Sequence, residues 1–92
     1  MREFDLNQLS DFRDVFPELT QAQFETGMLY SMGITKKEIG MLRSVSYSVV
    51  KETLDDIKKR MGIYSLNQLL SIFQVRLVLF CLKNCILKKS SK

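Results

Sequence analysis

The chain has 92 residues, 46% of them hydrophobic, which leaves room for one domain and excludes a disordered protein. It has no His, so the residue most often used for acid–base catalysis and metal binding is missing. The net charge of +4 hides an asymmetry: residues 1–25 carry two basic and six acidic side chains, whereas residues 57–92 carry eight basic and no acidic ones. The basic part is either a phosphate-binding surface, for nucleic acid or anionic lipid, or a solvated face.

A short helix is expected first, from about Asp5 to Val15, and Pro17 ends it because the residue before a proline is pushed out of the α conformation. Residues 1–5 lack the apolar stretch of a signal peptide, so we do not expect one here. The apolar side chains of this segment, available to cover a neighbouring helix, are Phe4, Leu6, Leu9, Phe12, Val15 and Phe16.

Ser and Thr residues mark the starts of four further helices. Such a hydroxyl can accept from a free amide at the helix start, and in a capping box the Glu or Gln three positions on reciprocates. Capping boxes are present at Thr20 and Gln23, Thr35 and Glu38, and Ser65 and Gln68, and Ser46 is a further N-cap. Gly33 and Gly62 suit the left-handed conformation that ends helices. The last helix is expected to reach residue 84 or beyond.

The spacing of apolar residues predicts one buried face for each of the middle helices. The side chains expected to point inward are Phe24, Met28 and Leu29, then Ile39 and Leu42, then Val50, Leu54, Ile57 and Met61. No segment alternates apolar and polar residues for long enough to predict a strand. We therefore expect an all-α fold, a small bundle of four to five helices with a long apolar C-terminal helix.

The last expected helix is apolar on nearly all sides, so more than one face should be buried. Its apolar run 77–82 lies between Arg76 and Lys83 and is far shorter than the roughly 20 residues of a membrane span. An apolar surface of this size marks an interface. A homodimer is the first interpretation; cover by the N-terminal helix alone, a heteromeric contact and a membrane contact are the alternatives. We expect the N-terminal helix and a twofold partner to share this surface.

Cys81 and Cys85 are four residues apart in an apolar segment of that helix. Two thiols without a His or a further Cys cannot form a zinc site of the usual kind, and a disulfide within one helix is poorly placed. We expect both to be buried free thiols, which fits a reducing cytoplasm.

Residues 35–60 have the layout of a helix-turn-helix: a short capped helix, a break at Arg43-Ser44-Val45 and a longer capped helix. In a DNA-binding unit of this kind the second helix presents its N-terminal half to the major groove, and the first crosses the backbone. The same layout also occurs in small helical bundles that do not bind DNA.

From Leu19 to Leu70 the chain resembles the DNA-binding domain of the LuxR-type (GerE-like) regulators, with the spacing kept without a gap. The similarity is carried by Leu19-Thr20 with Gln23, by residues 33–40 (GITKKEIG), by Val45-Ser46 with Val50-Lys51, and by Ile57 with Met61-Gly62-Ile63. The family usually has Glu at position 23, Ala at 40, Thr at 49, His at 53 and Leu at 61. Arg43 stands where a core Leu is expected, and a small shift would let Leu42 replace it.

The resemblance implies which residues contact DNA. Thr35, Lys36 and Lys37 would face phosphate at a helix N-terminus. In the recognition helix the residues toward the major groove would be Tyr47, Ser48, Lys51 and Glu52, with Lys51 reaching phosphate or guanine and Glu52 accepting from a cytosine amino group. Ser46, at the start of this helix, would also contact DNA. Lys58 and Lys59 would touch the backbone. Asp55 and Asp56 would weaken binding. The dimer contact would involve Leu69, Phe73, Arg76, Leu77 and Phe80.

The expected function is a sequence-specific, dimeric transcriptional regulator that binds double-stranded DNA in the cytoplasm, with recognition helix 46–60. The expected divisions are an N-terminal extension (1–18), the DNA-binding domain (19–70), the helix continuation (71–87) and a basic tail (88–92). We expect no cofactor, no metal, no membrane contact and no enzymatic activity, since the Ser residues lack a base and no glycine-rich phosphate loop occurs. The alternative is an adaptor that binds DNA weakly and pairs with another LuxR-type regulator through its last helix.

Overall fold

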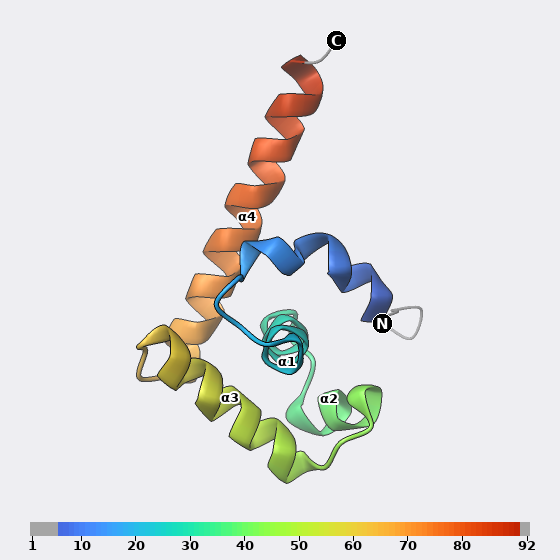
Figure 1. Cartoon of the computed structure of the whole chain (residues 1–92), viewed down its shortest axis with the longest axis vertical. Helices are drawn as coiled ribbons and strands as arrows, with labels where there is room; N and C mark the ends of the chain where they lie inside the picture. Colours follow the sequence, from blue (N-terminus) through green and yellow to red (C-terminus); the bar gives the residue numbers. More distant parts are fainter. Residues whose placement is uncertain (1–5, 91–92) are drawn as a thin grey trace.

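The computed structural model describes residues 6–90, and side chains within 8–85. In chain order the helices are η1 (Leu6–Val15), α1 (Gln21–Ser31), α2 (Lys36–Arg43), α3 (Tyr47–Met61) and α4 (Leu66–Ser90) (Figure 1). The described residues contain no strand, which confirms the expected all-α bundle with a long last helix. The expectations for Phe4, for the side chain of Leu6 and for the side chains of residues 86–92, at the end of the helix continuation and in the basic tail, concern parts outside that description.

The helices begin and end where local hydrogen bonds dictate. The three capping boxes and the Ser46 cap are all present, at Thr20, Thr35, Ser65 and Ser46. Gly33 and Gly62 have φ values of 90° and 68° and follow α1 and α3, as expected of residues that end helices. η1 ends before Pro17, but it is a 3₁₀ helix rather than an α helix.

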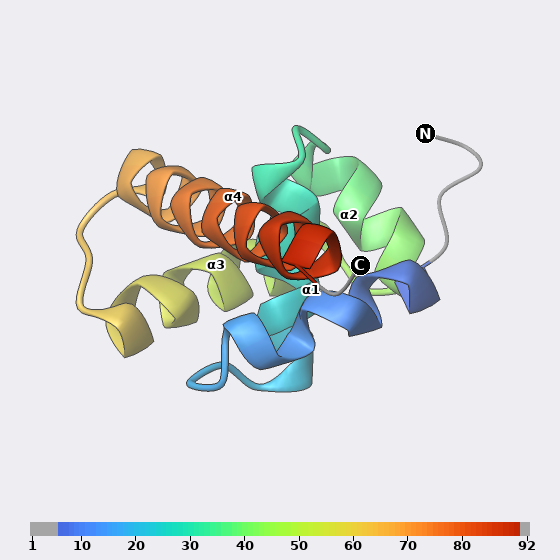
Figure 2. The same ribbon diagram turned by 90° about the horizontal axis from the view of Figure 1, so that it is seen from above.

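Helix α1 lies at the centre of the bundle and contacts η1, α2, α3 and α4 (Figures 1 and 2). The Phe24 and Leu29 side chains of α1 are fully buried. Around them α2 and α3 bury Ile39, Val50, Leu54 and Ile57, and α4 buries Leu69 and Phe73. These side chains are on the faces that the apolar spacing predicts. Leu42 is an exception, because 40% of its surface is exposed.

Phe73 of α4 packs face to face on Phe16, with ring centroids 4.2 Å apart. Its ring also lies directly against Gly27 of α1, where a Cβ atom would be only 2.4 Å from Phe73 Cζ. Glycine is therefore required at position 27 by space, so that α1 and α4 can approach closely. Phe16, Gly27 and Phe73 fix how α4 crosses the bundle.

The two halves of α4 have different surroundings. A helix of 25 residues is about 37 Å long, and its C-terminal half projects from the globule along the longest, 48 Å dimension of the molecule (Figure 1). Helix η1 covers one side of α4, where the Phe12 ring meets the Phe80 ring edge to face, with ring centroids 5.5 Å apart. The opposite side carries Val75, Val78 and Leu82, which are 55–56% exposed, and Leu79, at the border between the two sides, is 60% exposed. The N-terminal helix thus covers part of α4, as expected, and leaves an outer face open.

One helix among the described residues, over Leu66–Cys85, is long and apolar enough to cross a membrane by length and composition, with a mean hydropathy of 1.3. Its first turns are already used by the fold, because Leu69 and Phe73 are fully buried in the core. Arg76 is also committed, since it forms an ion pair with Glu18 at 2.7 Å. A span over this stretch would require the core of the bundle to open.

The expectation that Cys81 and Cys85 are buried is wrong. Both are free thiols, as expected, but both are exposed. The apolar neighbours that suggested burial belong to the projecting half of α4, which no other described element covers on its outer face.

The ion pair between Arg76 and Glu18 joins α4 to the segment between η1 and α1. Both terminal nitrogens of Arg76 donate to the Glu18 carboxylate, at 3.0 and 2.7 Å, and Nη1 also donates to the Val15 carbonyl oxygen at 3.1 Å. These hydrogen bonds hold the pKa of Glu18 below its ordinary value of 4.5, although partial burial opposes them.

A carboxylate whose pKa is lower in the folded chain stabilises the fold above its unfolded pKa, and this stabilisation is lost as the pH falls through the folded value. We therefore expect Glu18→Gln to lower the Tm near pH 7 but to have little effect in acid, below the pKa of the folded carboxyl. Thermal unfolding followed by circular dichroism across this range measures the effect. Asp14→Asn, which removes an exposed carboxylate, is the control. An equal loss of Tm for Glu18→Gln at both ends of the range would contradict this role.

Candidate nucleic-acid interface

Helices α2 and α3 are joined by a tight turn that begins at Ser44. Ser44 has φ 59°, and the amides of Ser44 and Val45 both donate to the Gly40 carbonyl oxygen. The turn lies so close to α2 that a Cβ atom on Gly40 would be 2.8 Å from the Val45 carbonyl oxygen. This close approach explains why Gly occupies position 40, where the resemblance would suggest Ala.

The outward face of α3 lies opposite its buried stripe. Val50, Leu54 and Ile57 point into the core, so the helical period places a second stripe on the far side. The residues of that outer stripe, all exposed, are Ser48, Glu52, Asp55 and Lys59. Tyr47 and Lys51 are also exposed on one flank, and Lys51 Nζ lies 5.7 Å from the Tyr47 ring centroid. The residues expected to face DNA are therefore accessible along one helix.

The start of α2 is the second part of this surface. The Thr35 hydroxyl accepts from the Glu38 amide, and Glu38 Oε1 accepts from the Thr35 amide, each at 3.2 Å. The capping box thus occupies the Thr35 side chain. Lys36 and Lys37 are the first two residues of α2, and the first amides of a helix have no partner within it, so these two amides can bind an anion.

Acidic residues lie among these basic ones. The first ten residues of α3 carry one basic side chain, Lys51, and three acidic ones, Glu52, Asp55 and Asp56. Asp55 is 3.4 Å from Lys58, which is half-buried, so part of the charge of each is neutralised by the other. Lys59 remains exposed beyond this pair. The basic character of the surface therefore comes from α2, from Lys51 on the flank of α3 and from Lys59 at the C-terminal end of the outer stripe.

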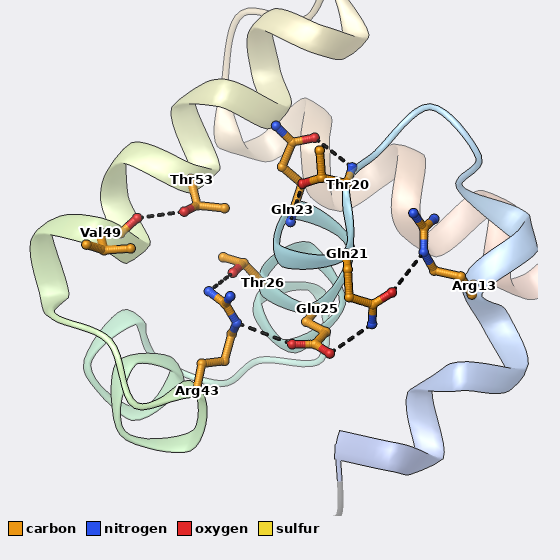
Figure 3. A network of polar contacts seen from close by, with 9 residues as sticks. All are labelled: Arg13, Thr20, Gln21, Gln23, Glu25, Thr26, Arg43, Val49 and Thr53. Carbon is orange, nitrogen blue, oxygen red and sulfur yellow. Dashed lines mark hydrogen bonds and ion pairs between the residues drawn. The ribbon is translucent and has the colours of Figure 1, made fainter.

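Arg43 holds α2 against α1, and sequence reasoning missed this role (Figure 3). Its Nη1 donates to the Thr26 hydroxyl at 2.8 Å, and its Nε lies 3.4 Å from Glu25. Glu25 in turn accepts from Gln21 at 2.8 Å, and Gln21 accepts from Arg13 of η1 at 3.1 Å. This chain of contacts joins η1, α1 and α2.

The expected replacement of Arg43 by Leu42 in the core is thus wrong. Arg43 keeps the inward position, with only 12% of its side chain exposed, because Thr26 and Glu25 satisfy its guanidinium. Leu42 is left at the surface. The available clue was the Arg itself at a position where the resemblance calls for Leu, but its partners lie 17 and 18 residues away.

The residues expected at a dimer contact have different positions. Leu69 and Phe73 are fully buried in the core of the same chain, so they have no surface to offer a second copy. Arg76 is bound to Glu18, while Leu77 and Phe80 are half-buried. The exposed apolar side chains of α4 are instead Val75, Val78, Leu79 and Leu82.

Comparison of the chain with models of known protein families, with curated proteins and with solved structures found no match.

We expect Arg43→Ala to lower the free energy of unfolding by about 2 kcal/mol, because it leaves Thr26 and Glu25 without a charged hydrogen-bond partner. Chemical denaturation measures this change. In a double-mutant cycle, Glu25→Ala should cost about 1 kcal/mol less in the Arg43→Ala background than in the wild-type chain. Strictly additive effects would show that the two residues are not coupled.

Proposed function

We propose that this chain is a DNA-binding transcriptional regulator of the LuxR type, with α3 as the helix that enters the major groove. The observation that carries this proposal is that the outer stripe of α3 and the N-terminus of α2 are both exposed and belong to the same pair of helices. The capped start of α3 exposes Tyr47, Ser48 and Lys51, the positions that the resemblance assigns to DNA. The major groove is wide enough to admit such a helix.

The available groups suit specific roles on a duplex. Lys36 and Lys37, next to the open amides of α2, would bind phosphate and set the orientation. Glu52, at the centre of the outer stripe, would accept from a cytosine amino group, and Lys51 beside it would reach guanine or phosphate. Base readout would then depend on one carboxylate and one ammonium group, while most of the affinity would come from lysine contacts with phosphate.

We further propose that α4 joins two copies of the chain through its outer face. The N-terminal part of that face is polar, at Asn67, Gln68 and Ser71, and it becomes apolar from Val75 onward. Val75, Val78 and Leu82 follow the 3–4 spacing of a helix-packing seam. Burying four large exposed side chains of each copy would remove an apolar surface that water otherwise meets.

A second function is favoured by the acids of α3. Glu52, Asp55 and Asp56 outnumber Lys51 in the half that would enter the groove, and carboxylates repel phosphate. In this alternative the chain binds DNA weakly and acts by pairing with another LuxR-type regulator through α4. The two functions differ in whether the chain alone binds DNA.

We expect the purified chain to bind a duplex from the region upstream of its own coding sequence, with an affinity that falls steeply as salt rises. Lys51→Ala and Lys36→Ala should each weaken binding roughly tenfold at low salt, because each removes a contact with DNA. Lys83→Ala removes one positive charge from α4 and is the control. Fluorescence anisotropy measures all four proteins. If both α2 and α3 variants bind like the wild type, α3 does not enter the groove.

We expect the chain to be a dimer at micromolar concentration and Leu82→Asp to make it a monomer, because a carboxylate cannot be buried in an apolar seam without a partner. Leu82 is exposed in the single chain, so the fold should survive this change. Ser71→Asp places the same charge on the polar part of the same side of α4 and should leave the dimer intact. Sedimentation equilibrium measures both, and a wild-type monomer would refute the proposed contact.

A further inference from the structure

The exposed thiols of Cys81 and Cys85 have no role in the core of the bundle. They are four residues apart on the regular helix α4, so they lie on one side of it, one turn from each other. Side chains with this spacing have Cβ atoms about 5–6 Å apart. Two thiols on one exposed turn can act together on a single ligand.

The spacing fits two sulfur atoms bound to one metal ion. Metal–thiolate bonds of about 2.3 Å place the sulfurs of a linear site about 4.6 Å apart. Helical side chains lean toward the N-terminus of the helix, so both sulfurs point in a similar direction. Small rotations about the Cα–Cβ bonds therefore bring them to this separation without a change in the backbone.

The surroundings decide which kind of ion fits. The described residues contain no group of three or more His, Cys, Asp or Glu side chains that could hold a metal ion, so a four-coordinate zinc site is not available within one chain. Soft thiolate ligands favour Cu(I), which accepts few ligands. The complex of one Cu(I) with two thiolates carries a single negative charge. Residues 57–92 contain no acid, so no carboxylate of this part of the chain opposes that charge.

We propose that Cys81 and Cys85 form a binding site for one soft, monovalent metal ion of low coordination number, for which Cu(I) is the probe. Binding of Cu(I) by two thiols forms two Cu–S bonds and releases two protons to solvent, with no change in the oxidation state of copper or sulfur. The site lies beside the outer face of α4, since Cys85 follows Val78 by seven residues. The proposal does not rest on the function of α3, and DNA binding can fail without affecting it.

The test is a titration of the full chain, with its thiols reduced, by Cu(I) in the absence of oxygen. A chromophoric Cu(I) chelator competes with the chain for the ion. Native mass spectrometry gives the stoichiometry. We expect one ion per chain. Cys81→Ser and Cys85→Ser should each weaken binding by at least about 100-fold, because each removes one of two ligands. Their Tm values should match that of the wild type, since both positions are exposed.

A matched variant keeps two thiols but moves one of them. Cys85→Ser combined with Lys83→Cys places the thiols at 81 and 83, on different sides of the helix, and should bind as weakly as the single variants. Cys85→Ser combined with Asn84→Cys keeps both on one side and should retain the site. The proposal is overturned if the 81/83 variant binds like the wild type, if one ion is bound per two chains, or if a Cys-free chain binds as tightly.

Discussion

The stack of Phe73 on Phe16 above Gly27 is the contact on which the arrangement of the other helices depends. It brings together the end of η1, the middle of α1 and the second turn of α4, with the two rings at 4.2 Å. Burial of a phenylalanine contributes about 1.5–3 kcal/mol, and a stacked pair adds about 0.5–1.5 kcal/mol. Arg76, one turn beyond Phe73, lies over the Phe16 ring at 5.2 Å and binds Glu18. Aromatic and polar contacts therefore anchor the same stretch of α4.

This anchoring of α4 leaves one exposed surface on α4 and another on α2 and α3. Because the first turns of α4 are fixed across α1, the remaining turns extend beyond the bundle, and their outer face is open to a partner. The same contacts occupy the sides of α1 that face η1 and α4. Its other side receives α2 and α3 (Figure 1), and the outer stripe of α3 remains exposed. A single buried cluster thus separates the surface proposed for DNA from the surface proposed for a second copy.

The features that the sequence predicts correctly depend on residues within about four positions of one another. Thr20, Thr35, Ser46 and Ser65 cap helices through hydrogen bonds to the next turn, so their neighbours in sequence suffice to predict them. Arg43 differs, because its partners Thr26 and Glu25 belong to another helix. The apolar neighbours of Cys81 and Cys85 indicated burial, but burial depends on where the other helices end. The spacing of apolar residues identifies the apolar face of a helix, but it does not show whether another helix covers that face.

The ion pairs also change what the net charge means. Three arginines are used inside the fold: Arg13 donates to backbone carbonyl oxygens, Arg43 binds Glu25, and Arg76 binds Glu18. Two acids of the N-terminal region are therefore neutralised within the bundle rather than displayed to solvent. The positive charge left near the outer stripe of α3 comes largely from lysines, which act as flexible point charges and recognise phosphate without the fixed fork of a guanidinium. Lysines at this surface would supply attraction to any duplex. Discrimination between base sequences would then depend on Glu52 and its neighbours. At these positions the resemblance to DNA-binding helices favours contact with DNA, whereas the acidic residues of α3 oppose it.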